Sequence, residues 1–172
     1  MKIKKTIFPQ NSMLSKTNSD YFDCYIGSIE GNVKNITSDE VGRAFFMSSP
    51  KWIEKLMSLR NKTVSVFGLK TSEKSDYNKE NLNIFIAEIG QRVGLFKIIE
   101  KTENELILGE DDKHLNFKVS LLLDDLKENL TIITVVNFNN WFGKLYFFII
   151  KPFHKMIVPI MLKGTIKFFN KK

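Results

Sequence analysis

The feature that most constrains the fold is a period of two in two neighbouring segments, in which apolar residues recur at nearly every second position. Residues 115–123 alternate in this way, with Phe117 and Val119 on the apolar side, and residues 130–138 repeat the pattern. A period of two is typical of a β-strand that has one face on a core. Turn-rich residues interrupt the region after residue 84, which therefore predicts four or five antiparallel strands in a meander.

Residues 20–30 predict an earlier strand, because they alternate in the same way. One side of that strand carries Phe22, Cys24 and Ile26. The other side carries Tyr21, Asp23 and Tyr25. The residues before it, 1–19, are polar and irregular and predict an N-terminal arm that packs loosely. Cys24 is the only cysteine, so no disulfide can form within the chain, and its place in a strand indicates a small buried hydrophobe.

Two helices are predicted after this strand. Thr37 and Glu40 have the spacing of a capping box, in which each side chain accepts a hydrogen bond from an amide at the start of a helix. Ser49 followed by Pro50 gives a second start signal, and an apolar stripe from there runs to about Gly68.

The last segment, residues 142–169, returns to a helical period. One apolar stripe at 100° per residue predicts the face that packs on the sheet. That stripe consists of Phe142, Tyr146, Ile149, Phe153, Ile157, Ile160 and Gly164. Pro152 and Pro159 each remove a backbone donor and predict a bend or a break. Three further apolar residues lie outside this stripe, namely Phe148, Leu162 and Ile166. We expect them to pack under the arm or a loop, or else to form a dimer or membrane-surface contact.

Composition indicates one folded domain. The chain has 172 residues, of which 43% are hydrophobic, enough to build one substantial core. Its longest uninterrupted apolar stretch, Leu145 to Ile150, is far shorter than the roughly 20 residues that cross a bilayer, so no membrane span is expected. The first residues lack the apolar region of a secretory signal, and we expect a cytoplasmic location.

The net charge of +7 is concentrated near the C-terminus. Residues 139–172 contain seven Lys and neither Asp nor Glu. No Arg accompanies these lysines and no groove-reading motif is present, so specific nucleic-acid binding is not expected. A solvated helix face is the favoured interpretation, and weak contact with a membrane surface is the alternative.

The order of elements resembles the START-like, or helix-grip (SRPBCC-type), superfamily, and local motifs resemble a bacterial family of unknown function within it. The similarity covers about residues 20–165 and rests on Ala44-Phe45-Phe46, Pro50-Lys51-Trp52, Leu59-Arg60-Asn61, Phe67-Gly68-Leu69-Lys70, Gly94-Leu95-Phe96, Leu108 to Leu115, Tyr146 and Pro152-Phe153-His154. The resemblance implies one α+β domain over residues 20–172, in the order β-α-α-β(4 to 5)-α, with a curved antiparallel sheet around a long kinked C-terminal helix.

In that family the domain is sometimes joined to an NAD(P)-binding, epimerase-like domain. No G-x-G-x-x-G follows a strand in this sequence, so no dinucleotide or other cofactor is expected. The resemblance supplies no catalytic residue set either, and none is predicted. The densest group of potential metal ligands is Glu110, Asp111, Asp112 and His114, whose spacing fits neither a calcium loop nor a zinc site, so no metal is expected.

The leading functional hypothesis is noncatalytic binding of a small hydrophobic or amphipathic molecule between the sheet and the C-terminal helix. Its candidate residues are Tyr25, Arg92, Phe117, Val119, Tyr146, Ile149, Phe153 and His154. An alternative is a cyclase- or dehydratase-like enzyme in which His154 and Tyr146 act as general acid and base. Peripheral membrane association and a homodimer remain further alternatives.

Overall fold

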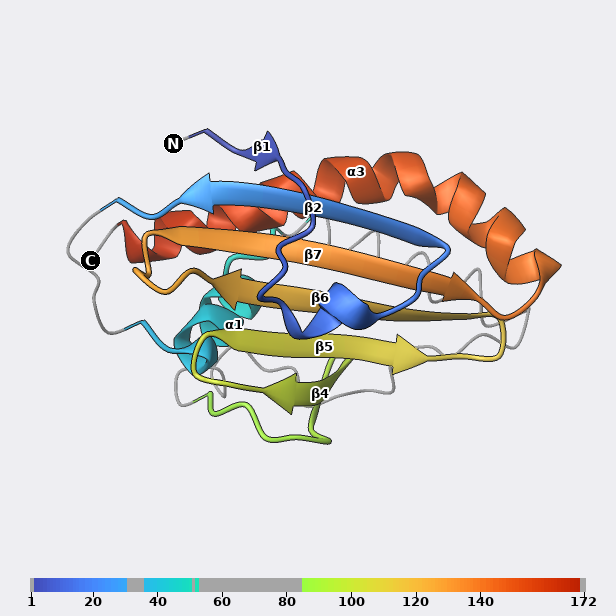
Figure 1. The fold of residues 1–172 in the computed structure, drawn as a ribbon, viewed down its shortest axis with the longest axis horizontal. Coiled ribbons are helices and arrows are strands. Elements are labelled where there is room, and N and C mark those ends of the chain that lie inside the picture. The colour runs from blue at the N-terminus through green and yellow to red at the C-terminus, as the bar shows by residue number, and fades with distance from the viewer. Residues whose placement is uncertain (1, 31–35, 51, 53–84, 171–172) are drawn as a thin grey trace.

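The computed structural model describes residues 2–30, 36–50, 52 and 85–170. These residues form one antiparallel sheet, two α-helices and one 3₁₀ helix (Figure 1). The elements are β1 (Lys4–Lys5), η1 (Met13–Lys16), β2 (Tyr21–Ser28), α1 (Ser38–Met47), β3 (Arg92–Val93), β4 (Phe96–Lys101), β5 (Glu105–Asp111), β6 (Leu115–Leu123), β7 (Asn129–Phe138) and α3 (Trp141–Phe169). The predicted helix at 49–68 lies almost wholly outside the described residues, although Trp52 is helical.

The seven strands of the sheet have the order β1-β2-β7-β6-β5-β4-β3. Strands β3 to β7 form the predicted meander, and β2 pairs with β7 to continue the sheet. An open antiparallel sheet with a long C-terminal helix confirms the α+β, helix-grip-like fold class. The strand predicted over residues 115–123 is also confirmed, since β6 spans the same residues.

Alternate residues of the central strands contribute to two different cores. The helix face of the sheet, which includes Leu106, Leu121 and Ile132, packs against α1 and α3. The arm face, which includes Ile107 and Ile133, packs against the N-terminal arm. In Figure 1 the arm crosses in front of the sheet while both helices lie behind it. Strands β5 to β7 are therefore apolar on both sides, as buried strands are expected to be.

The prediction of a loosely packed N-terminal arm is wrong. Leu14 in η1 is buried on the arm face beside Cys24, which confirms the latter as a buried hydrophobe. A polar contact fixes the same turn, because the buried carboxylate of Glu105 accepts hydrogen bonds from Ser12 Oγ at 2.6 Å and from the Met13 amide at 2.8 Å. Ser120 Oγ donates a third at 2.5 Å. A carboxylate with three donors satisfies the rule that buried charges are hydrogen-bonded.

The Glu105→Gln substitution is expected to loosen the arm. The amide group replaces one acceptor oxygen by a donor, so either the Met13 amide loses its acceptor or the Ser12 and Ser120 hydroxyls must turn to accept. We expect a loss of about 1–3 kcal/mol in the free energy of unfolding. Urea denaturation measures that loss, and amide exchange of residues 12–17 reports whether the arm opens first. Unchanged exchange in the arm would contradict this expectation.

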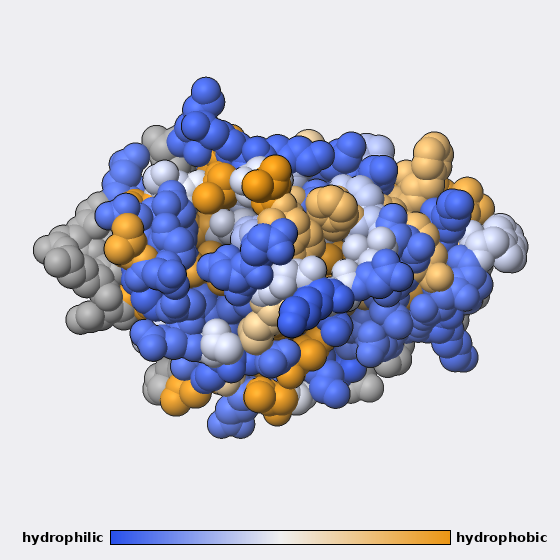
Figure 2. Space-filling view, viewed as in Figure 1, coloured by the Kyte–Doolittle hydropathy of each residue, from blue (hydrophilic) through white to orange (hydrophobic). Residues whose placement is uncertain are grey.

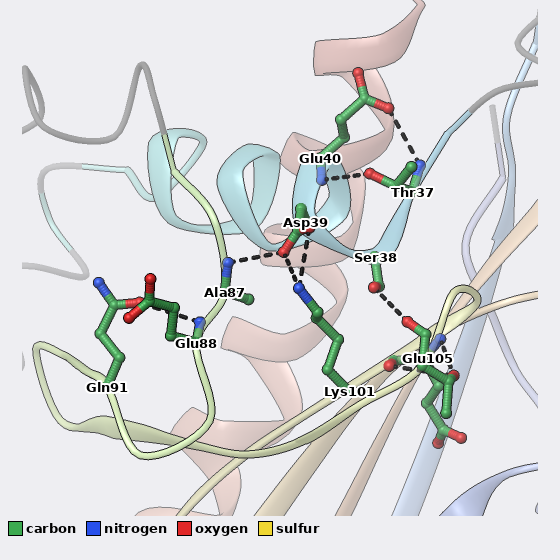
Figure 3. Close-up of polar contacts among 10 residues, drawn as sticks. Thr37, Ser38, Asp39, Glu40, Ala87, Glu88, Gln91, Lys101 and Glu105 are labelled. Atoms are coloured by element: carbon green, nitrogen blue, oxygen red, sulfur yellow. Dashed lines mark hydrogen bonds and ion pairs between the residues drawn. The ribbon is translucent and has the colours of Figure 1, made fainter.

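Helix α1 begins at the predicted capping box (Figure 3). Thr37 Oγ1 accepts from the Glu40 amide, and Glu40 accepts from the Thr37 amide, which confirms the prediction. Beside this cap, Asp39 accepts from the Ala87 amide at 2.7 Å and from Lys101 Nζ at 3.0 Å. One carboxylate at the helix start therefore holds the segment before β3 close to β4.

Helix α3 runs unbroken through both prolines, and Figure 1 shows that it bends along its length. Its sheet-facing side agrees with the predicted stripe only in part, since Ile157 and Ile160 pack against the core on the helix face. Ile149 and Phe153 are 58% and 48% exposed, whereas Leu162 and Ile166 are fully buried in the core on the helix face. The complete buried set is Gly143, Phe147, Val158, Met161, Leu162, Thr165, Ile166 and Phe169.

Helix α3 is apolar around most of its circumference. Its longest apolar stripe therefore does not identify the side that packs on the sheet. Close packing decides instead. Gly27 of β2 leaves room for α3, since a Cβ there would lie 2.6 Å from Ile166 Cδ1. Ser48 after α1 similarly approaches Thr165, with 3.4 Å between the two hydroxyl oxygens. These small and polar contacts give the sheet-facing side a weaker apolar signature than the exposed side.

By length and composition alone, α3 could cross a bilayer, which the apolar-run estimate from the sequence did not anticipate. In its most apolar 18-residue stretch, 22% of the residues are buried inside the protein. A core helix of a soluble protein passes the same test, so this property by itself assigns no membrane span.

Candidate functional site

A hollow of about 340 Å³ lies along the sheet where β4, β5 and β6 meet the residues before β3. Its size falls in the usual range for small-molecule pockets. The lining residues are Ile89, Gly90, Arg92, Lys97, Ile98, Ile99, Gly109, Glu110, Asp111 and Lys118. Because Asp39 holds the Ala87 amide, the 89–90 wall of the hollow is tied to α1 (Figure 3).

Two lysines flank a glycine across the strands of this hollow. Lys97 of β4 pairs in register with Gly109 of β5, which pairs in turn with Lys118 of β6. The two lysines therefore lie on the same side of the sheet, with their Cα atoms about 10 Å apart, which is two strand spacings. Within the residues that the structure describes, neither lysine is in ion-pair distance of a carboxylate. An anionic group that lies between the two lysine side chains would face two uncompensated positive charges.

Gly109 is required by close packing. A Cβ on this residue would collide with the carbonyl oxygen of Phe117 and lie 2.8 Å from Ile99 Cδ1. Every other residue type would therefore force neighbouring strands apart. The position directly over Gly109 is therefore occupied by the Phe117 carbonyl and the Ile99 side chain.

At the rim of the hollow, Arg92 forms an ion pair with Glu110. Arg92 Nη2 donates to Oε1 at 2.9 Å, and Nη1 lies 2.6 Å from Oε2. The carboxylate is buried while the guanidinium is substantially exposed. The Arg92 guanidinium therefore compensates the Glu110 charge and leaves its other edge exposed at the rim. Planar guanidinium groups commonly bind carboxylates and phosphates.

A second polar cluster lies on the helix face, between β2 and α3. The carboxylate of Asp23 is 1% exposed and accepts a 2.6 Å hydrogen bond from Tyr21 Oη. His154 Nε2 lies 3.1 Å from Oδ2 of the same carboxylate, and the imidazole keeps 19% exposure. Lys151 Nζ stands 4.8 Å from the centre of the Tyr21 ring. Tyr21 and His154 are therefore two polar partners of a carboxylate that would otherwise be buried without them.

The environment of Asp23 shifts the pKa of the groups around it. Burial acts to raise the pKa of the Asp23 carboxyl, but hydrogen bonding and charge from His154, with the Tyr21 hydrogen bond, outweigh it and lower that pKa. Burial first, and then Asp23, raise the pKa of Tyr21 and of Tyr25. Burial, helped by the Asp23 charge, raises the pKa of the Cys24 thiol to about 11, so the reactive thiolate is disfavoured.

The structure brings few of the predicted ligand-binding residues together. Arg92 lines the hollow. Val119 is buried in the core on the helix face, with Tyr25 and Phe117 half-buried against it, and Tyr146 is half-buried beside Phe147. His154 does contact the sheet, through the Asp23 carboxylate. Ile149 and Phe153 lie on the exposed side of α3.

Sequence reasoning missed Lys97, Lys118 and Asp23 as site residues. The two lysines are 21 positions apart, and only the strand register brings them into one row. Asp23 carried a signal, because it was a single carboxylate on a strand side otherwise occupied by tyrosines. Among the described residues, no three of His, Cys, Asp or Glu are grouped so that they would hold a metal ion.

The sheet, its gripping helix and the sheet-edge hollow define an α+β domain of helix-grip-like architecture. A family model matches residues 16–161, most of the chain, and the protein belongs to that family, which is described as a protein of unknown function, DUF2867. No curated protein and no solved structure gives a significant match.

Proposed function

We propose that this domain binds a small amphipathic molecule with an anionic group, a carboxylate or a phosphate, in the hollow between β4, β5 and β6. The observation that carries the proposal is the row Lys97–Gly109–Lys118, which places two uncompensated cations on either side of a residue without a side chain. The resemblance to START-like proteins supports a role in binding over one in catalysis, since it supplies no catalytic residue set.

The lining of the hollow contains both apolar and charged side chains. Ile89 and Ile99 provide apolar surface, and Lys97 and Lys118 provide positive charge, while Arg92 is paired with Glu110 and Asp111 adds one carboxylate. An apolar lining with few polar groups gives both affinity and orientation. The anionic group would approach the lysines, and the apolar part would lie along the isoleucines. This position is at the far edge of the sheet from α3, where the sequence had located the ligand.

Decanoate provides a direct probe, with decanol as the uncharged molecule of equal chain length. Calorimetric titration is expected to show binding of decanoate and much weaker binding of decanol. Each of Lys97→Gln and Lys118→Gln should raise the decanoate Kd about 2- to 5-fold, the amount expected for a partly exposed charge interaction. Decyl phosphate in the same titration tells whether carboxylate or phosphate is preferred.

The matched control is the double variant Lys144→Gln/Lys155→Gln, which removes two lysine charges from α3 and leaves the hollow unchanged. It should bind decanoate like the unaltered protein. Equal binding of decanoate and decanol, or an equal loss in the control variant, would overturn the proposed orientation. Native mass spectrometry of the protein purified from its own cells then identifies the physiological ligand.

A further inference from the structure

The first half of α3 exposes a continuous apolar surface, independent of the hollow. Six large apolar side chains between residues 141 and 156 point away from the core, including Trp141 at 75% and Phe148 at 74% exposure. The complete set, here called the exposed apolar face, is Trp141, Leu145, Phe148, Ile149, Phe153 and Met156. At 3.6 residues per turn these positions occupy an arc of about 140°. In Figure 2 apolar surface is visible at the upper right, over the part of α3 that extends past the sheet.

Positive charge borders this face, and α3 itself carries no acidic residue. Lys144, Lys151 and Lys155 recur at helical spacing along one flank of the exposed apolar face. No Asp or Glu occurs anywhere from residue 129 to residue 172. Lys151 interacts with the Tyr21 ring, which leaves Lys144 and Lys155 as the outward charges of this flank. Aromatic and aliphatic side chains beside lysines match an anionic lipid surface, where apolar groups enter and cations meet the headgroups.

The second half of α3 restricts how the helix can meet a membrane. Val158, Leu162 and Ile166 pack into the core on the helix face, so a helix that spanned the bilayer would have to leave the sheet. The exposed and the buried sides coexist in the first half, where Phe147 is buried against Tyr21 while Phe148 is exposed. This arrangement favours a helix that lies in the plane of the interface with the domain still folded.

We propose that the exposed apolar face of α3 docks on an anionic phospholipid bilayer, with Trp141 and Phe148 inserted into the interfacial region and Lys144 and Lys155 at the headgroups. The site is separate from the sheet-edge hollow, and neither proposal depends on the other. Two alternatives compete with this proposal. The exposed apolar face could contact a second copy of the chain, or α3 could span the bilayer, and each alternative gives a different experimental result.

Trp141 supplies the probe. In a Trp52→Phe background it is the one tryptophan left, since the sequence has two. Vesicles of phosphatidylglycerol with phosphatidylcholine should shift its emission to the blue and sediment the protein, and pure phosphatidylcholine should bind far less. Lys144→Gln/Lys155→Gln should lower the partition coefficient roughly 30-fold at low salt, because each lysine near an anionic surface contributes about a fivefold factor.

Phe148→Glu tests the apolar part and should lower partitioning at least roughly tenfold without loss of stability, because this side chain is exposed. Leu126→Glu is the matched control, an exposed residue in the turn between β6 and β7, and should partition normally. Lys97→Gln/Lys118→Gln is the matched charge control and should also partition normally. A domain that fails to bind vesicles yet retains decanoate binding would overturn only the docking proposal.

Two further results would overturn docking in the plane of the membrane. A concentration-dependent dimer in analytical ultracentrifugation, abolished by Phe148→Glu and accompanied by no vesicle binding, would assign the exposed apolar face to a second copy of the chain. Retention on vesicles through high salt and alkaline carbonate washing would indicate a bilayer span, because a peripheral contact made partly by lysines is released.

Discussion

Replacing Leu162 with alanine is expected to destabilise the domain by about 2–5 kcal/mol, the range for removal of a fully buried leucine side chain. Leu162 is 0% exposed and belongs to the core formed by α1, α3 and the helix face of the sheet. The cavity left behind borders two helices and several strands, so little of it can close by local movement. Chemical denaturation followed by tryptophan fluorescence and by circular dichroism measures the loss and tests whether the transition remains two-state.

Phe153→Ala on the same helix is the matched comparison. Its side chain is larger than that of leucine, yet it is 48% exposed, so the substitution should cost less than about 1 kcal/mol. The pair therefore tests which side of α3 meets the sheet. A large loss for Phe153→Ala together with a small one for Leu162→Ala would restore the stripe inferred from the sequence and contradict the packing described above.

The strands and the cap of α1 were predictable because their signals are local. Alternation along residues 115–123 determines which side chains point to each face, and that pattern is complete within the strand itself. The Thr37 and Glu40 capping box likewise needs only its own backbone amides. The structure has five strands after residue 84, and the sequence predicted four or five.

The orientation of α3 was not predictable because it depends on which partners lie opposite. Gly27 and Ser48 provide space for the side with Thr165 and Ile166, and neither residue is near α3 in the sequence. The exposed side carries larger apolar residues and so produces the stronger periodic signal. If docking on a bilayer is correct, that signal reflects burial in lipid, which a pattern cannot distinguish from burial in protein.

The candidate sites show the same division between local and long-range information. Arg92 was selected for its residue type and does line the hollow, but Lys97 and Lys118 have no distinguishing local sequence. Their significance comes from a register shared by three strands. His154 was also selected by type, and its partner Asp23 is 131 residues away. Pairings at this separation follow from topology and not from spacing.

Asp23→Asn is expected to destabilise the domain by about 1–3 kcal/mol, the cost of mismatching the partners of a buried hydrogen-bonding group. The carboxylate is almost completely buried and receives both the Tyr21 hydroxyl and the His154 imidazole. An amide retains one acceptor oxygen, but it presents a donor where a second acceptor is needed. Urea denaturation at neutral pH measures the difference.

The pH dependence of stability gives this prediction a sign. The pKa of the Asp23 carboxyl in the folded protein is lowered from its ordinary value of 3.8, so the folded state holds the proton less tightly than the unfolded chain. The resulting stabilisation is complete above the unfolded value and is lost as the pH falls through the lower folded value. The wild-type protein should therefore lose part of its stability below about pH 4, and Asp23→Asn should lack that component. Equal acid limbs in the two proteins would show that the pair does not contribute it.

A double-mutant cycle separates the Asp23–His154 interaction from the burial of each partner. His154→Gln alone removes the imidazole partner of the buried Asp23 carboxylate and should also be destabilising. The double variant Asp23→Asn/His154→Gln removes the charge and its partner together, so its loss should be smaller than the sum of the two single losses. Additive losses would mean that the two side chains do not interact in solution, and the cluster would then be two separate buried polar groups.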